Sequence, residues 1–371
     1  MPEGATLGFV KRSPTGSGAS NGVFSGSLGA FAGGSTTAAN LVWSEVGSAD
    51  LSATLTSASY LGSGLTASGS TGAAGAVGPF IPHHFDVAAT PACNAVFSYG
   101  GQPFVSSVTA RNGLSPAGTT VNFDGSSATT PNQATAVIVG EASALGLGSL
   151  SGGSIAASGF VAGVASASLS YPFTSKTTAP QTLTLRASNG LGGAAGVSSA
   201  GYVESSMPLR SGRLRVSNAF GSASAALQLP VVAEYWSANS WVLNSADNCT
   251  MLAGSSIVLS NPRNAAGNSS TASSVAAGVV VLANGSGLIP LAAPTPAGSS
   301  LSLDLAVNLG SSAADQSCQA NHPASSGAGK PWLRAQNGSC AATADRDPSA
   351  RASFGIYSPE TRRTVHVREI F

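Results

Sequence analysis

The stretch Ser300–Val307 (SLSLDLAV) alternates leucine or valine with small or polar residues at every second position. Successive side chains of a β-strand point to opposite faces of its sheet, so this period of two predicts a strand with one face in the core and one face in water. Short strand-like runs recur along the chain between segments rich in Gly, Pro, Asn and Ser, among them Ala39–Glu45, Ser52–Tyr60, His84–Ala89, Ser106–Arg111, Thr135–Gly140, Gln181–Ser188, Gly212–Ser217, Ala225–Trp236 and Ser256–Leu259. Many short strands separated by turn residues are typical of packed β-sandwiches.

Length and two changes in composition indicate the domain organisation. A chain of 371 residues is too long for one small core. The Gly/Ala/Ser stretch Ser68–Gly78 and the segment Ser205–Ser211 each interrupt the strand-like pattern. We therefore predict an all-β protein of two to three tandem Ig-like or jelly-roll-like β-sandwich domains with Gly/Ser-rich loops. The predicted parts are an N-terminal β region over residues 1–80, short enough to be the remnant of a sandwich begun upstream, an Ig-like sandwich over residues 81–205 and a C-terminal sandwich over residues 206–371.

Charge is scarce and unevenly distributed. Charged residues make up 8% of the chain, against roughly 25% in an average globular protein. The net charge of +1 gives no electrostatic reason to expect a nucleic-acid partner. Nine of the 31 charged residues lie in Asp345–Phe371, which predicts the ion-paired closing strands of the last sandwich or a docking end.

Membrane and export signals are absent from the sequence pattern. The longest apolar run, Val275–Ala283, has nine residues, whereas a helix that crosses a bilayer needs about 20. Met1–Gly18 lacks the apolar core of a secretory signal peptide. We expect no membrane span and no signal peptide in this chain.

Four cysteines, Cys93, Cys249, Cys318 and Cys340, form no CxxC motif and have no His at a metal-ligand spacing. An even number of cysteines in an exported chain favours disulfides. We favour a Cys249–Cys318 bond, which would stabilise the C-terminal domain by roughly 4 kcal/mol through loop closure, and leave the partners of Cys93 and Cys340 open.

Three patterns bear on catalysis or metal binding. Gly18–Gly22 (GASNG) matches the nucleophile-elbow pattern GxSxG, but its flanks lack the strand and helix that the elbow requires. His84 and Asp86 share a strand face and can interact, whereas the adjacent His83 should point away, so a shared metal ion is not expected. Oxygens for Ca²⁺ are offered by Asp345 and Asp347 with neighbouring Asp304 or Asp315, but ion pairs of Asp345 and Asp347 with Arg334, Arg346 or Arg351, or a turn before Pro348, explain these two better. We assign no catalytic residue, no cofactor-binding residue and no metal ligand, with Ca²⁺ as the one cofactor left open.

Two patterns bear on surfaces. Arg213 and Arg215 lie on one strand face, with Arg210 just before them, and predict ion pairs with Glu234 or Glu369, or else a patch for an anionic glycan or lipopolysaccharide. Trp236 and Trp241 flank the turn-like segment SANS, and we expect both rings in the sandwich core rather than on a sugar.

Several segments, in order, carry a family resemblance. Arg210–Trp236 (RSGRLRVSNAFGSASAALQLPVVAEYW) and Asp347–Tyr357 (DPSARASFGIY) are followed by a chain end in VREIF, and Trp43–Leu55, Phe80–Val87 and Phe97–Phe104 precede them. This set resembles the C-terminal region of MshQ-like proteins, which are associated with the mannose-sensitive haemagglutinin (MSHA) type IV pilus. The resemblance implies an exported, pilus-associated or cell-surface β protein of a Gram-negative bacterium, without known catalysis.

The function expected from these observations is structural or adhesive, not enzymatic, at the cell surface or outside the cell. The expected partners are pilus or other cell-surface proteins, further copies of the chain, or surface glycans. Alternatives are a self-assembling extracellular fibre or sheath subunit and, less favoured, a secreted hydrolase. A docking strand is predicted near the chain end, where it would complete the chain's own sheet or extend that of a partner, with the residues Val365, Val367, Arg368, Ile370 and Phe371.

Overall fold

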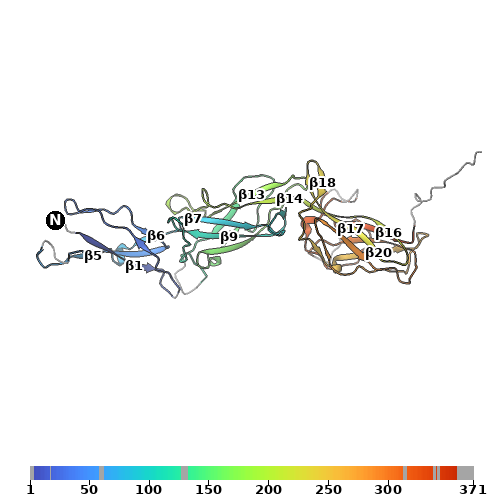
Figure 1. Ribbon diagram of the computed structural model, residues 1–371, viewed down its shortest axis with the longest axis horizontal. Helices are drawn as coiled ribbons and strands as arrows, with labels where there is room; N and C mark the ends of the chain where they lie inside the picture. Colours follow the sequence, from blue (N-terminus) through green and yellow to red (C-terminus); the bar gives the residue numbers. More distant parts are fainter. Residues whose placement is uncertain are drawn as a thin grey trace, which may run out of the picture.

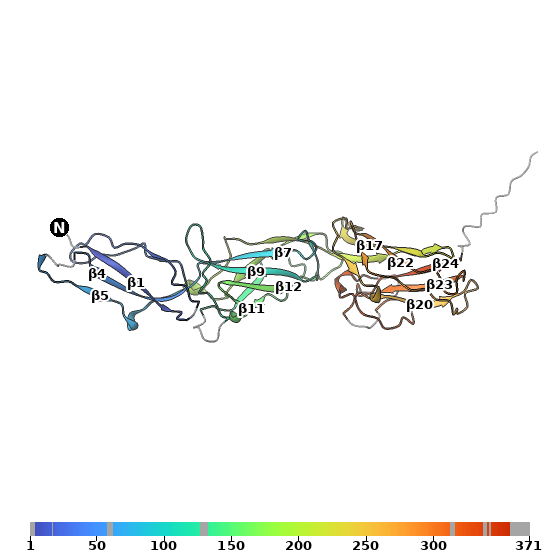
Figure 2. The same ribbon diagram turned by 60° about the horizontal axis from the view of Figure 1, so that its bottom comes forward.

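Three β-units follow one another along the long axis of the molecule (Figures 1 and 2). The computed structural model describes residues 4–356 except for residues 17, 58–61, 127–132, 312–315, 337–339 and 341–342. Within these ranges the regular structure is strand, joined by loops and single 3₁₀ turns, so the predicted all-β class with tandem β-sandwich domains is confirmed. None of the described residues belongs to a helix long and apolar enough to cross a membrane.

The N-terminal unit is a small twisted sheet in the order β1-β4-β5, with β6 also paired to β4. A separate two-stranded ribbon, β2-β3, adds Phe24 and Trp43, which pack with Phe9 of β1 into an aromatic cluster. The strands are β1 (Ala5–Ser13), β2 (Phe24–Ser25), β3 (Val42–Trp43), β4 (Gly47–Leu55), β5 (Ser68–Ser70) and β6 (Val77–Phe80), and the 3₁₀ turn η2 spans Ala73–Gly75.

The middle unit is a two-layer sandwich of sheets β11-β10-β13-β14-β8 and β12-β9-β7. Alternate residues of facing strands, such as Val108, Leu183 and Leu185, are fully buried between the layers. The elements are β7 (His84–Thr90), β8 (Ser98–Tyr99), β9 (Phe104–Arg111), β10 (Val137–Glu141), β11 (Ser154–Ile155), β12 (Val164–Leu169), β13 (Gln181–Ser188) and β14 (Ser206–Arg210), with 3₁₀ turns η3 (Ala157–Gly159) and η4 (Gly193–Ala195).

The C-terminal unit is a second sandwich, of sheets β15-β17-β18 with β22 on β17 and β16-β24-β23-β20, plus the ribbon β19-β21. Its core is built mainly from the leucines and valines of β17, β22 and β23. The elements are β15 (Gly212–Val216), β16 (Ala219–Gly221), β17 (Leu227–Ser237), β18 (Ser240–Leu243), β19 (Met251–Leu252), β20 (Ile257–Arg263), β21 (Val280–Val281), β22 (Ser286–Leu291), β23 (Leu301–Val307) and β24 (Ser349–Phe354), with 3₁₀ turns η5 (Gly254–Ser256) and η6 (Pro331–Leu333).

Two expectations about strands need correction. β23 is a strand as predicted, but its second face is not wet, because Asp304 and Ala306 are 4% and 0% exposed. The strand runs in the interior of its sheet between β20 and β24, where the guanidinium of Arg351 from β24 covers Asp304.

The domain boundary expected at residue 206 falls inside a sheet of the middle unit, since β14 pairs with β13 and runs to Arg210.

The charged C-terminal stretch contributes one closing strand to the described structure. β24 lies between β16 and β23 in the second sheet of the C-terminal unit. The predicted docking residues Val365, Val367, Arg368, Ile370 and Phe371 lie outside the described residues.

A buried carboxylate joins the N-terminal and middle units. Glu45, 6% exposed, accepts hydrogen bonds from the backbone N–H groups of Val121 and Asn122 at 3.2 and 3.0 Å. The Asn122 side chain in turn pairs with the backbone of Ser20 at 2.8 and 2.9 Å. Burial raises the pKa of Glu45, although the backbone hydrogen bonds oppose that rise. Loops of the two units are therefore connected by directional bonds as well as by the chain itself.

Candidate functional site

A disulfide between Cys93 and Cys249 ties the middle unit to the C-terminal unit. Cys93 lies in a turn between β7 and β8, and together with Phe97 and Tyr99 it is buried in the core of the C-terminal sandwich. The other bond, Cys318–Cys340, lies within the C-terminal unit. The predicted Cys249–Cys318 pairing is therefore wrong, because the turn that carries Cys93 reaches the neighbouring domain and brings its sulfur to Cys249.

Beside this disulfide, a buried polar network spans the same joint. Tyr99, 1% exposed, donates a hydrogen bond from its phenol oxygen to Oδ2 of Asp247 at 2.7 Å, and Asn244 Nδ2 donates to that phenol oxygen at 2.7 Å. Asp247, 0% exposed, also accepts from the Thr250 hydroxyl at 2.7 Å and from the backbone N–H groups of Thr250 and Cys249 at 2.9 and 3.1 Å. Burial first, and then the Asp247 charge, raise the pKa of Tyr99 well above its usual value. A buried polar network in which every donor and acceptor has a hydrogen-bond partner favours a single arrangement of its side chains.

Two cations complete the joint. The Arg210 guanidinium lies 4.7 Å from the ring centre of Phe97 and 4.8 Å from that of Tyr235, and it donates to Oδ1 of Asn244. The Lys176 ammonium, from the loop between β12 and β13, donates to the backbone oxygen of Gly212 at 2.7 Å and to that of Trp332. Burial lowers the pKa of Lys176 to about 8. Charged side chains of the middle unit thus pair with acceptors and rings of both units.

Metal binding at the joint does not fit its chemistry. Among the described residues, Cys93, Asp247 and Cys249 are the one group of three or more potential ligands that converge. The two sulfurs are bonded to each other, so neither is the thiolate that binds a metal. Asp247 already accepts four hydrogen bonds from protein donors other than sulfur.

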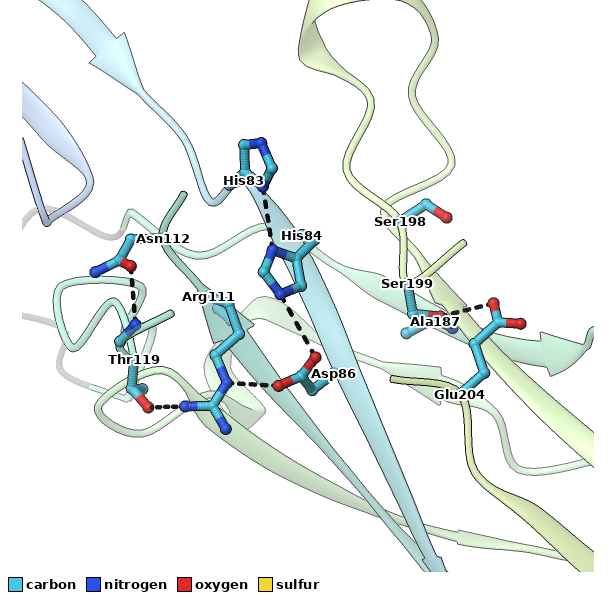
Figure 3. Close-up of polar contacts among 12 residues, drawn as sticks. His83, His84, Asp86, Arg111, Asn112, Thr119, Ala187, Ser198, Ser199 and Glu204 are labelled. Carbon is cyan, nitrogen blue, oxygen red and sulfur yellow. Dashed lines mark hydrogen bonds and ion pairs between the residues drawn. The ribbon is translucent and has the colours of Figure 1, made fainter. Parts of the chain in front are cut away.

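The histidine cluster lies at the start of β7 (Figure 3). Nε2 of His84 lies 3.5 Å from Oδ1 of Asp86, and Oδ2 of Asp86 accepts from Nε of Arg111 at 2.7 Å, so the predicted His84–Asp86 interaction is confirmed. His83 does not point away as expected, since its Nδ1 lies 3.2 Å from Nδ1 of His84. His83 precedes the first residue of β7, so the alternation of a strand does not govern its direction.

The electrostatics of this cluster favour a neutral His84. Its ring stacks on Tyr202 with the ring centres 3.8 Å apart and is buried. Burial lowers the pKa of His84, Asp86 opposes this, and His83 and Arg111 add to the lowering. With Arg111 already paired to Asp86, the group forms a structural ion-pair cluster.

Within the described part of the chain, the aspartates considered for Ca²⁺ do not converge. Asp347, 0% exposed, is paired with Arg334, whose Nε donates to it at 2.7 Å, and Asp304 is paired with Arg351 at 2.9 Å. Asp345 is 55% exposed and lies 3.3 Å from Nε of Arg346. The Asp347–Arg334 and Asp345–Arg346 contacts confirm predicted ion pairs, whereas the Asp304–Arg351 pair was not predicted. Asp315 lies outside the described residues.

The arginines of β15 share one buried acid. Nε of Arg213 and Nε of Arg215 donate to opposite oxygens of Glu234 on β17, at 2.7 and 3.0 Å, which confirms the predicted cross-strand pairs with Glu234. The other candidate acid, Glu369, lies outside the described residues.

The SANS segment is a hairpin turn as predicted, with Ala238 and Asn239 at φ of 48° and 67° between β17 and β18. The expected burial of its two tryptophans in the core is wrong, since Trp236 and Trp241 are half-buried and belong to neither core cluster. Both lie at the exposed end of a hairpin whose outer face also carries Arg213.

Ser20, the serine of the GxSxG pattern, lies in a loop between β1 and β2, so no strand leads directly into its turn and a strand, not a helix, comes next. Its hydroxyl accepts a hydrogen bond from the backbone N–H of Gly22 at 3.0 Å. Ser20 therefore lacks the strand–turn–helix context that exposes a nucleophile in hydrolases.

Sequence reasoning missed the residues that form the domain joint. Tyr99, Asp247 and Lys176 lie in unrelated stretches of the chain, and no local spacing connects them. The one local pattern near these residues that could have drawn attention to the joint was the aromatic and Gly-rich run Phe97–Phe104.

Models of one protein family match most of the chain. The third domain of DUF6701 matches residues 45–192, and the fourth domain of DUF6701 matches residues 210–370. No functionally curated protein matches the chain.

Solved structures give weaker similarities. The adhesin InvE of Yersinia pseudotuberculosis is 14% identical over 73% of this chain and 58% of that chain, with a TM-score of 0.26, so the chain spans little more than half of that structure. The Escherichia coli adhesin FdeC is 14% identical over 83% of this chain and 82% of that chain, with a TM-score of 0.30. Overlap at this level carries no conclusion about function.

Proposed function

We propose that this chain, which carries the third and fourth domains of the DUF6701 family, is a non-enzymatic, structural or adhesive protein of the cell surface. Its mechanism is display: sandwich domains stacked end to end hold a binding surface at a distance from the cell. The resemblance to MshQ-like proteins supports a place in or alongside an MSHA-type type IV pilus.

The observation that carries this proposal is the joint between the middle and C-terminal units. A display function needs a joint that does not bend freely, whereas domains of one chain ordinarily move relative to each other unless their interface is extensive. Here a disulfide, the buried Tyr99–Asp247 bond and the Lys176 contacts act together across one junction. The two disulfides also support an oxidising location, since such bonds persist outside the cytosol.

The proposal is tested on cells that make the native protein. Antibody labelling of intact cells should detect the chain, and protease added outside should remove it. A strain lacking the gene should attach less well to surfaces, and attachment should return when the wild-type gene is restored. Detection only after cell lysis, or unchanged attachment in the deletion strain, contradicts the proposal.

The pilus association needs its own experiment. In a strain that lacks the pilus, we expect the surface amount of the chain or its contribution to attachment to fall. Removal of Val365–Phe371 tests the proposed docking strand in the same assay: a truncated chain that folds and still assembles at the surface excludes that role. A purified chain that forms filaments by itself under the electron microscope would favour the fibre or sheath alternative.

A further inference from the structure

Two adjoining hollows form a groove beside the joint between the middle and C-terminal units. One, of about 270 Å³, is lined by Arg213, Arg215 and Arg346, and the other, of about 400 Å³, by Lys176, Arg213 and Trp241. Arg213, Ala335 and Gln336 line both hollows. We propose that this groove binds an acidic saccharide, a chain of uronic acids, and this inference rests on the adhesive function proposed above.

Arginine geometry supports a carboxylated ligand. Glu234 is 7% exposed and binds Arg213 and Arg215 through their Nε atoms, so that one buried acid fixes two guanidinium groups on the outer face of the sheet. Within the described structure, Arg213 donates its hydrogen bond through Nε alone. A planar guanidinium held in this way can present its outer N–H groups to a carboxylate as a bidentate pair.

The charge balance of the groove is positive. Arg213, Arg215 and Arg346 face two acids, Glu234 and Asp345, which leaves one net positive charge before Lys176 is added. Nε of Arg346 is buried without a hydrogen bond, and its ion-pair partner Asp345 is largely exposed. Asp347, which also lines the groove, is neutralised by Arg334. An anion that enters the groove would therefore meet a net positive charge.

The aromatic wall suits a sugar ring. Trp241 is half-buried, lies edge-to-face with Trp236 at 5.5 Å between ring centres, and has the Arg213 guanidinium 4.4 Å from its own centre. An aromatic ring offers an apolar face with specific geometry, against which the C–H face of a sugar can pack while its carboxylate reaches an arginine. Uronic acids combine these two features in each residue. The net charge of +1 over the whole chain does not favour nucleic acid as the alternative polyanion.

The position of the groove between two domains also supports a ligand-binding site. Lys176 and Thr177 come from the middle unit, and the other lining residues come from the C-terminal unit. Ligand sites occur preferentially at such domain junctions. Because the disulfide and the Tyr99–Asp247 bond lock the junction, the groove is held in shape before a ligand arrives.

The test is a calorimetric titration of the full chain with short oligogalacturonate at low salt, beside a neutral maltooligosaccharide of equal length and inorganic phosphate. We expect oligogalacturonate alone to bind, and added salt to weaken it. Arg215→Gln and Trp241→Ala should each weaken binding about tenfold, since each removes one charge-assisted or stacking contact. The matched control is Arg186→Gln, which removes an arginine paired to Glu204 in the middle unit and should leave affinity unchanged.

Three outcomes overturn the proposal: no binding of oligogalacturonate, equal binding of the neutral sugar or of phosphate, or an equal loss in Arg186→Gln. If Trp241→Ala does not fold, as judged by circular dichroism, Arg215→Gln decides alone, because Arg215 is half-exposed. A wild-type chain that is displayed on cells but binds no oligogalacturonate refutes the saccharide site and leaves the proposed display function standing.

Discussion

Tyr99 and Asp247, 148 residues apart in the chain, form a 2.7 Å hydrogen bond inside the joint between two domains. The phenol comes from β8 of the middle unit and the carboxylate from the loop before β19 of the C-terminal unit. Both side chains are almost completely buried, so the bond is shielded from water on both sides. The joint is therefore part of a protein core, whereas most contacts between tandem domains are exposed and polar.

Tyr99→Phe should lower the free energy of unfolding by about 1–3 kcal/mol, because it removes one donor to buried Asp247 and leaves Asn244 Nδ2 without that acceptor. Urea unfolding followed by tryptophan fluorescence measures this change. Tyr202→Phe is the control, since Tyr202 is 47% exposed and its ring, which stacks on His84, is retained. Equal midpoints for Tyr99→Phe and the wild type would rule out a stabilising role for the bond.

The double variant Cys93→Ser/Cys249→Ser should make the joint flexible. The bond links residues 156 positions apart, and its removal should cost about 2–5 kcal/mol. Small-angle X-ray scattering should then show a wider range of molecular dimensions. Cys318→Ser/Cys340→Ser, which opens a link of 22 positions inside one domain, should destabilise that domain without changing the scattering envelope. Identical scattering from both variants would show that the interdomain disulfide does not stiffen the molecule.

Asp347→Ala should destabilise the C-terminal domain by about 3–5 kcal/mol, because it leaves the Arg334 guanidinium without its buried partner. It also removes the acceptor for the backbone N–H of Leu309 at 3.0 Å. Asp345→Ala should leave the melting temperature unchanged, since that carboxylate is largely exposed. Differential scanning calorimetry of the two variants separates these effects, and equal melting temperatures would contradict the assignment.

Acid pH should weaken the middle domain through His84. Its pKa is lowered in the folded state from 6.5, mainly by burial, so the unfolded chain takes up a proton first as the pH falls. The stability that depends on neutral His84 is therefore complete above about pH 6.5 and is lost as the pH falls toward the lowered folded pKa. His84→Gln should flatten this part of the profile, measured as the urea midpoint between about pH 8 and pH 5. Parallel profiles for the variant and the wild type would exclude His84 as the titrating group.

Local patterns predicted those parts of the structure that one strand or one hairpin determines. Alternation along β15 placed Arg213 and Arg215 on one face, where Glu234 of the paired strand meets both. The turn at Ala238 and Asn239 closed the hairpin as expected, and Asn239 is a residue that tolerates the left-handed backbone found there. The burial of the adjacent tryptophans was not predictable in this way, since it depends on which loops cover the outer face of the sheet.

The sequence by itself determined the all-β class, the strand periodicity and the His84–Asp86 contact, because the geometry of the extended backbone sets them within a few residues. Only the tertiary structure decided the cysteine pairing, the Tyr99–Asp247 bond and the groove beside Trp241. These features join residues from different domains, and their contacts exist only once two folded sandwiches meet at a particular angle. No spacing along the chain encodes that angle, since it follows from the complementary shapes of surfaces that form after each domain has folded.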